Sequence, residues 1–254
     1  LTELQELSRN TAVTDAFEMG STFKVVTLAS ALQEGVVNQN STFYCSGVKY
    51  VDGQKIRCWK THGDQTLEEA VENSCNSAFM EMGLRLGTDK MYEYIEKFGF
   101  GQKTNVDFPS DGTGIVQDKS DVKSFDLARM SFGQSIAVTP LQLITAVSAA
   151  VNGGKLMQPY IVSSVRDAEG NTVLENEPKE VRQVISEDTS AQVRSLLESV
   201  VENGSGKNAQ IPGYRVGGKT GTAQKYENGQ VAAGKNVASF VGFAPADDPE
   251  IVVL

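Results

Sequence analysis

The segment Gly20-Ser21-Thr22-Phe23-Lys24 decides how this chain is interpreted, because a serine and a lysine stand together at the start of an apolar stretch. Ser21 and Lys24 are three residues apart, a spacing that places both side chains on one face of a helix. A serine hydroxyl needs a neighbouring base to attack a carbonyl, and burial can keep a lysine amine neutral for that task. The residues that follow predict a buried helix over 21–34, ended by Gly35.

Composition limits the classes of function that fit this chain. Its 254 residues, of which 40% are hydrophobic, are enough for one substantial core. The formal net charge is −9, with acidic residues spread along the sequence. This charge argues against a nucleic-acid partner or an anionic membrane surface, because both need clustered lysine and arginine. No apolar run approaches the length of a membrane-spanning helix.

Three cysteines, Cys45, Cys58 and Cys75, share the chain with a single histidine, His62. Their spacing matches no standard zinc motif, so we expect no metal site and no cofactor. An odd number of cysteines leaves at least one thiol free or paired between chains, and one disulfide is possible. The only histidine lies in a glycine-containing loop, where we expect a structural or surface role, which argues against a Ser-His-Asp triad.

Periodicity and turn signals divide the chain into an early helical part and a late sheet. Helices are predicted over 21–34, 66–86, 90–98, 124–130, 141–151 and 186–203. Strands are predicted at 43–45, 49–51, 56–59, 160–165, 172–174, 214–224, 237–244 and 251–254, with Asn228-Gly229 in the loop between the two longest. The pattern predicts one α+β domain in which helices pack against a late antiparallel sheet.

Two further motifs follow the first one along the chain. Ser74-Cys75-Asn76 lies at a predicted break between helices, and Lys219-Thr220-Gly221-Thr222 lies on a predicted strand. Each motif is common by chance, but all three in this order form the set that is typical of penicillin-binding proteins and serine β-lactamases.

The flanking residues extend this resemblance to class B penicillin-binding proteins. Glu18-Met19-Gly20-Ser21-Thr22-Phe23-Lys24 is similar to their E-P-G-S-T-F-K-type segment, with Met19 in place of the usual proline. Further similar segments are Cys58-Trp59, 131–135, 138–142 and 217–224. The match spans essentially the whole chain, and it most resembles the division transpeptidases and the stage V sporulation protein D type.

The resemblance implies a penicillin-binding protein or serine β-lactamase-like fold, with helices packed on an antiparallel sheet. On this reading residues 1–254 are a transpeptidase domain, partly truncated at both ends. The chain begins with Leu1 rather than Met and ends on apolar residues. We therefore expect an upstream membrane anchor and pedestal, and a final C-terminal segment, to lie outside it.

The resemblance also implies roles for the motif residues in acyl transfer. Ser21 would be the nucleophile and Lys24 the base that accepts its proton. Ser74 would relay a proton towards the leaving amine, with Lys219 nearby as a second positive charge. Asn76 would hold the substrate amide and Lys24 by hydrogen bonds.

The third motif would bind the substrate. The hydroxyls of Thr220 and Thr222, with Lys219, would hold its terminal carboxylate. Gly221 would let the substrate backbone lie close to the strand. The backbone N–H groups of Ser21 and Thr222 would form the oxyanion hole, in which each donor is worth roughly 3–4 kcal/mol.

The implied function is that of a peptidoglycan D,D-transpeptidase, which cross-links stem peptides through a serine acyl-enzyme and is acylated by β-lactams. The implied partners are peptidoglycan stem peptides, β-lactam antibiotics and, through regions outside this chain, other cell-wall synthesis proteins. No nucleic acid is expected. The implied location is the extracytoplasmic face of the bacterial cell membrane.

Three alternatives share the motifs. A class A β-lactamase is disfavoured because Cys75 stands where its second motif has aspartate, and because residues 107–114 offer no glutamate to activate water. A D,D-carboxypeptidase and a non-enzymatic β-lactam sensor domain stay open. The segments Gly133-Gln134 and Thr139-Pro140 favour the transpeptidase.

Cys75 lies between two candidate catalytic residues. It is either a small buried apolar residue or one half of a redox pair, with Cys58 or with Cys45, that would distort the site when oxidised.

Overall fold

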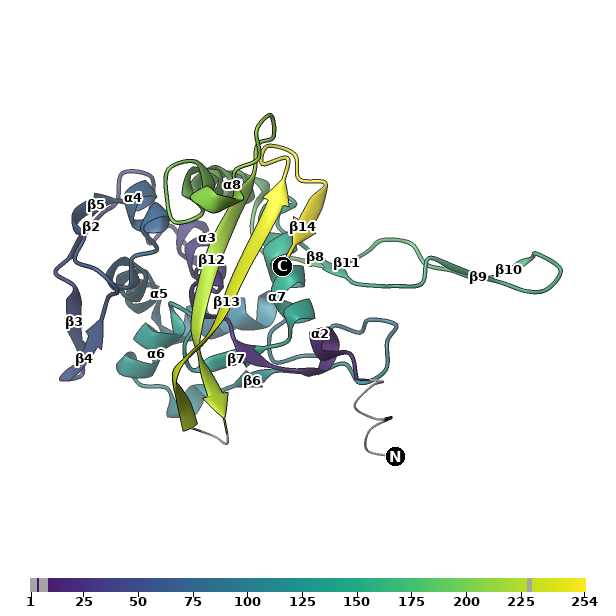
Figure 1. Ribbon diagram of the computed structural model, residues 1–254, viewed down its shortest axis with the longest axis horizontal. Coiled ribbons are helices and arrows are strands. Elements are labelled where there is room, and N and C mark those ends of the chain that lie inside the picture. The colour runs from purple at the N-terminus through teal and green to yellow at the C-terminus, as the bar shows by residue number, and fades with distance from the viewer. Residues whose placement is uncertain (1–3, 5–8, 228–229) are drawn as a thin grey trace.

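The computed structural model describes residues 4, 9–227 and 230–254, and its centre is helix α3 (Lys24–Gln33). Every residue from Lys24 to Leu32 is buried, as the apolar sequence predicts. Helix α3 packs against α5, α7 and α8, so the helix that follows Ser21 is enclosed by the rest of the fold (Figure 1).

Local capping signals set the starts of several helices. Thr66 and Glu69 form a capping box at α4, and Thr139 and Gln142 form another at α7. The helices are α2 (Thr11–Thr14), α4 (Leu67–Glu72), α5 (Asn76–Lys97), α6 (Ser124–Met130), α7 (Pro140–Val151) and α8 (Glu187–Glu202), with 3-10 turns η1 (Gly20–Thr22), η2 (Lys119–Asp121) and η3 (Lys207–Ala209). The predicted breaks before α5 and at Gly87 are confirmed, because Gly87 has non-helical backbone angles (φ 80°, ψ 162°) inside α5.

The late sheet contains the three predicted strands. Strands β12 (Gly217–Glu227), β13 (Gln230–Ala244) and β14 (Ile251–Val253) are antiparallel, in the order β12-β13-β14. Strand β12 has the predicted length but lies three residues further along the chain, and β13 begins seven residues earlier than predicted. The expected turn at Asn228-Gly229 lies outside the described residues. Within the part of the chain that the structure describes, β12 pairs only with β13, so its other edge has no strand partner there, and β12 lies beside η1.

Short strand pairs surround the helices. They are β1 (Phe17–Glu18) with β7 (Ile136–Val138) and β6 (Ile115–Val116), β2 (Thr42–Cys45) with β5 (Gly63–Thr66), β3 (Val48–Val51) with β4 (Gln54–Arg57), β8 (Lys155–Gln158) with β11 (Lys179–Gln183), and β9 (Ser164–Arg166) with β10 (Thr172–Glu175). The hairpin of β9 and β10 was predicted and projects from the body (Figure 1). The sequence did not indicate six of these strands, namely β1, β5, β6, β7, β8 and β11.

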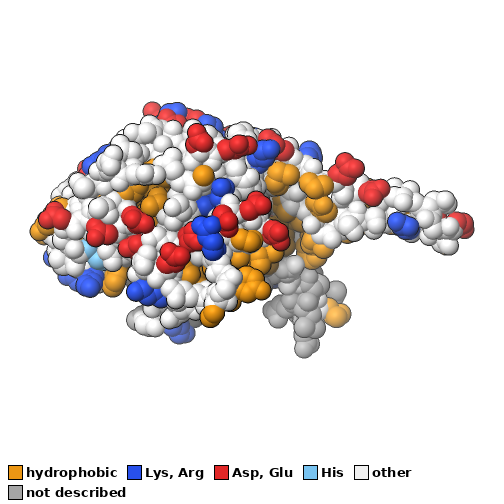
Figure 2. All heavy atoms as spheres, turned by 90° about the horizontal axis from the view of Figure 1, so that it is seen from above, with side chains coloured by type: hydrophobic (Ala, Val, Ile, Leu, Met, Phe, Trp, Pro, Cys, Tyr) orange, Lys and Arg blue, Asp and Glu red, His pale blue; other side chains and the backbone are white. Residues whose placement is uncertain are grey.

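The α+β prediction is confirmed by this arrangement. Acidic and basic side chains are interspersed on the face seen in Figure 2, in keeping with the absence of a basic surface expected from the composition. Among the described residues, no helix has both the length and the apolar character that crossing a membrane requires.

Candidate active site

Ser21 lies in the 3-10 turn η1, between strand β1 and helix α3. The turn is held by Thr22, whose hydroxyl donates to the carbonyl of Met19 at 2.9 Å. Ser21 is half-buried, whereas Lys24 at the start of α3 is 1% exposed. The predicted position of Ser21 at the entrance to a buried helix is therefore confirmed.

The second motif lies where α4 ends and α5 begins. Ser74 has a left-handed backbone (φ 48°), which is uncommon for a residue other than glycine and is typical of strained functional positions. Lys24 Nζ donates to the Ser74 carbonyl at 2.7 Å, to Ser74 Oγ at 3.1 Å and to Asn76 Oδ1 at 2.7 Å. The first two motifs thus meet at the Lys24 ammonium group.

The third motif reaches the same serine from strand β12. Lys219 is 1% exposed, and its Nζ donates to Ser74 Oγ at 2.8 Å. Ser74 Oγ therefore accepts from two lysines, which engages both lone pairs and leaves its own O–H free to donate elsewhere. The structure brings Lys24, Ser74, Asn76 and Lys219 together, as the motif roles require.

Burial controls the charge of both lysines. Removal from water lowers the pKa of Lys24 to about 7, although negative charge on Cys58 and Cys75 opposes the shift. Burial, and secondarily the positive charge of Lys24, holds the pKa of Lys219 well below its usual range. A neutral Lys24 is therefore accessible near neutral pH, and a neutral amine can act as a base.

The remaining residues of the third motif follow along β12. Thr220 is half-buried and its hydroxyl donates to Ser205 Oγ at 3.4 Å, while Thr222 is exposed. Ser205 was not singled out by the sequence, because it stands outside every motif. A Cβ on Gly221 would lie 2.3 Å from Ser239 Oγ and 2.9 Å from the carbonyl oxygen of Met19. Gly221 thus has a packing role, and its predicted contact with substrate stays a prediction.

Comparison with known proteins places this geometry in a family. The family model described as the penicillin binding protein transpeptidase domain matches residues 2–254. The chain belongs to this family. The relationship explains why the three motifs converge on Ser74.

Individual relatives of this transpeptidase domain agree with the family match. The chain is 51% identical over 250 residues to "Stage V sporulation protein D" of Bacillus subtilis, covering 97% of this chain and 39% of that protein. It is 30% identical to "Probable peptidoglycan D,D-transpeptidase PenA" of Neisseria gonorrhoeae, covering 98% of this chain and 41% of that protein. The chain therefore spans about two fifths of the length of these curated relatives.

Solved structures confirm the predicted penicillin-binding fold. A D,D-transpeptidase domain from Eggerthella lenta superposes with a TM-score of 0.88 at 33% identity, covering 99% of this chain and 65% of that one. Penicillin-binding protein 3 from Mycobacterium tuberculosis, complexed with ampicillin, gives a TM-score of 0.90 at 29% identity, covering 96% of this chain and 56% of that one.

Gly20 lets strand β12 approach turn η1 of this transpeptidase domain. Its φ is +55°, and a Cβ there would lie 2.5 Å from the carbonyl oxygen of Thr222. We expect Gly20→Ala to lower the free energy of unfolding by about 1–3 kcal/mol more than Gly35→Ala, as overpacking does. Gly35 is a matched control, because its φ is +66° but nothing lies within 4 Å of its added Cβ. Urea unfolding measures both variants, and equal losses would contradict the close approach.

The predicted redox pair also lies in this region. The three thiols are buried and free, and Cys58 Sγ lies 4.0 Å from Cys75 Sγ. The hydrogen bond between them holds the pKa of Cys58 well below its usual range and, with burial, that of Cys75 above it.

The redox role of this pair stays a prediction. A Cys58–Cys75 disulfide should pull Cys75 away from its position between Ser74 and Asn76, and so slow penicillin labelling. Thiol counting with and without a reductant, beside labelling with a fluorescent penicillin, tests it. Labelling that ignores the redox state would contradict this role.

Proposed function

We propose that this chain is the catalytic domain of a peptidoglycan D,D-transpeptidase and that β-lactams acylate it at Ser21. The observation that carries the proposal is the buried Ser74 hydroxyl, which accepts hydrogen bonds from both Lys24 and Lys219. A serine one helical turn from the first of these lysines, at the mouth of the site, completes the arrangement needed for acyl transfer.

Acylation begins when Ser21 Oγ attacks the carbonyl carbon of the peptide bond between two terminal D-alanines. The neutral amine of Lys24 takes the hydroxyl proton as the Oγ–C bond forms. The tetrahedral intermediate then collapses, the C–N bond breaks, and the leaving amine receives a proton. Ser74 supplies it from its free O–H and regains one from Lys24, so the lysine ends the step neutral. A β-lactam follows the same course, but its leaving nitrogen stays attached to the adduct.

Deacylation reverses these transfers with a different amine. An amino group from a neighbouring stem peptide attacks the ester carbonyl of the acyl-enzyme. Its proton passes through Ser74 and Lys24 to Ser21 Oγ, which leaves as the hydroxyl. The product is a peptide cross-link, and the enzyme returns to its starting state.

Strand β12 supports the binding of an extended peptide. Its free edge lies beside η1, so a substrate backbone can add to the sheet there as a further strand. In this pose the N–H groups of Ser21 and Thr222 act as the oxyanion hole. The Thr220 and Thr222 hydroxyls, with Lys219, hold the terminal carboxylate.

The proposed substrate also sets the proposed location. Peptidoglycan lies outside the cytoplasmic membrane. The proposed site therefore acts on the extracytoplasmic face of the bacterial cell membrane, in a parent protein that is anchored to that membrane. Other cell-wall synthesis proteins are proposed partners of the parent protein.

Product analysis separates this function from its alternatives. The protein is incubated with a stem-peptide donor and an amine acceptor, and the products are resolved by mass spectrometry. We expect a cross-linked product. Free D-alanine alone would indicate a D,D-carboxypeptidase, and a stable adduct only with a β-lactam would indicate a sensor domain.

A further inference from the structure

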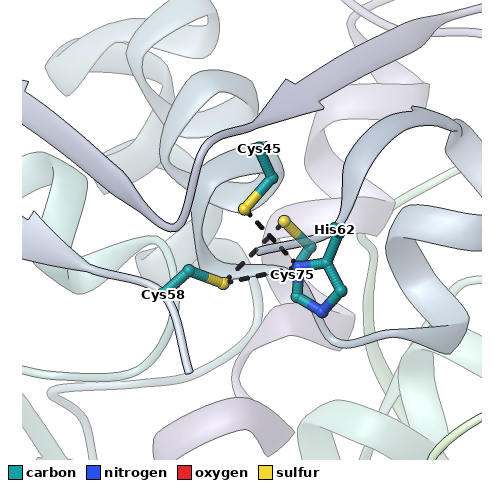
Figure 3. A group of neighbouring side chains, drawn as sticks. All are labelled: Cys45, Cys58, His62 and Cys75. Carbon is teal, nitrogen blue, oxygen red and sulfur yellow. Dashed lines mark hydrogen bonds between the residues drawn. The ribbon is translucent and has the colours of Figure 1, made fainter. Parts of the chain in front are cut away.

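A buried cluster of three thiols and one imidazole lies directly behind the second motif. Its members are Cys45, Cys58, His62 and Cys75, and their ligand atoms all lie within 4.8 Å of one another. The three sulfur atoms and the imidazole ring point towards a common centre (Figure 3). We propose that these four side chains bind one zinc ion. From their spacing in the sequence we expected no metal site, and this proposal replaces that expectation.

The distances within the cluster fit a tetrahedral ion. Zinc bonds of about 2.3 Å to sulfur and 2.0–2.1 Å to nitrogen imply ligand atoms about 3.6–3.8 Å apart. The measured separations are 3.5 Å from His62 Nδ1 to Cys45 Sγ, 3.7 Å from Nδ1 to Cys58 Sγ and 4.0 Å between the sulfurs of Cys58 and Cys75. A single ion therefore needs only small side-chain movements to reach all four ligands.

The histidine ring is oriented for this role. Nδ1 faces two sulfurs, whereas Nε2 is buried with no hydrogen-bond partner among the described residues. The edge of the ring also contacts Trp59, with ring centroids 5.1 Å apart and an interplanar angle of 71°. These contacts hold Nδ1, rather than Nε2, towards the common centre.

The backbone around the cluster also supports metal binding. The amide of Asn76 donates to Cys58 Sγ at 3.3 Å, a contact that stabilises a thiolate ligand. Strand pairing fixes the other side, because Cys45 at the end of β2 pairs with Gly63 at the start of β5. The ligands thus come from β2, from the segment between β4 and β5, and from the N-cap of α5, which are rigid elements of the fold.

Charge balance favours zinc at this place. The cysteines bind as thiolates, so the protons that their thiols still carry pass to solvent on loading, and three thiolates around a divalent ion carry a net charge of about −1. Lys24 and Lys219 are fully buried, and neither has a salt bridge among the described residues. An anionic metal site near Lys24 would stabilise the ammonium form that this base reaches when it accepts a proton. Sulfur and imidazole ligands in tetrahedral geometry select zinc over magnesium or calcium.

The proposed ion would fix the second motif. Cys75 lies between Ser74 and Asn76, both of which contact Lys24, so a bond from Cys75 to the metal would restrain that segment. A disulfide between Cys58 and Cys75 would consume two ligands, so the metal-bound and disulfide states exclude each other. An effect of zinc on penicillin labelling would depend on the proposed function being correct. The zinc content of the protein tests the metal site independently of that function.

The test measures metal directly on the reduced protein. The protein is incubated with a reductant and zinc chloride, freed of excess metal, and examined by native mass spectrometry and elemental analysis. We expect about one zinc per chain, retained in the presence of magnesium. Reduced protein that keeps no stoichiometric zinc after this loading would overturn the proposal.

Variants identify the ligands. We expect Cys45→Ser and His62→Ala each to weaken zinc binding by at least about 10–100-fold, in competition with a chromophoric chelator. Ser46→Ala is the matched control, because Ser46 follows Cys45 in sequence, is exposed and bonds the carbonyl of Val48. It should bind zinc as the wild type does. Unchanged zinc affinity in both Cys45→Ser and His62→Ala would overturn the proposed site. If a variant does not fold, the zinc content of the wild-type protein after loading decides whether the proposal stands.

Discussion

Replacing Ser21 with alanine is expected to abolish covalent labelling by a fluorescent penicillin. The proposed adduct is an ester on Ser21 Oγ, so no acyl bond can form without that oxygen. Loss of a serine nucleophile elsewhere costs about 10⁶-fold in turnover. Intact-mass spectrometry of Ser21→Ala after exposure to a β-lactam should show only the unmodified chain. Because Ser21 is half-buried at the mouth of the site, the free energy of unfolding should change by no more than about 0.5 kcal/mol.

Ser30→Ala is the control for this substitution. Ser30 lies on α3, the helix that follows the turn of Ser21, is fully buried, and donates to the carbonyl of Val26 at 2.7 Å. Its removal should lower the free energy of unfolding by about 1 kcal/mol and leave labelling intact. An adduct that survives in Ser21→Ala would refute the assignment of the nucleophile.

Local sequence signals were enough to predict the motif residues and every helix except the short α2. The helix after Ser21 follows from an apolar run, and α4 and α7 follow from capping pairs that act within four residues. Each of these signals depends on residues that are close in sequence, so it can be recognised in a single sequence without an alignment. Strands β13 and β14 were predicted for the same reason, since they contain valine, phenylalanine and isoleucine, which favour extended backbone.

Long-range packing decided what the sequence could not show. The motifs predicted that Lys24, Ser74 and Lys219 act together, but not that both ammonium groups bond one hydroxyl oxygen. Likewise, Cys45 and His62 meet Cys58 and Cys75 only because β2 pairs with β5 and packs against α5. The one available signal was the order Cys, Cys, His, Cys within a short stretch, which fits no standard spacing. Strands β8 and β11 show no alternation of apolar and polar residues, so nothing in the sequence marked their pairing.

Replacing Lys24 with methionine is expected to slow acylation by about 10²–10⁴-fold, the usual contribution of a general base. Methionine is also unbranched and only one atom shorter, but it cannot accept the proton of Ser21. The wild-type rate should rise about tenfold per pH unit up to about pH 7 and then level, because burial lowers the pKa of Lys24 to about 7 and only the neutral amine is a base. Stopped-flow measurement of β-lactam acylation across this range gives the profile.

The pH profile, rather than the rate alone, assigns this role to Lys24. Its Nζ also holds Ser74 and Asn76, so Lys24→Met leaves their oxygens unpaired and could slow the reaction by distorting the site. Lys219→Met is the matched control, because Lys219 is equally buried and bonds the same Ser74 Oγ. Distortion alone should leave the rise towards pH 7 in place in either variant. Loss of the base should remove it from Lys24→Met and keep it in Lys219→Met, since the titrating amine is still present there. A rise through pH 7 that persists in Lys24→Met would assign the proton transfer to another group.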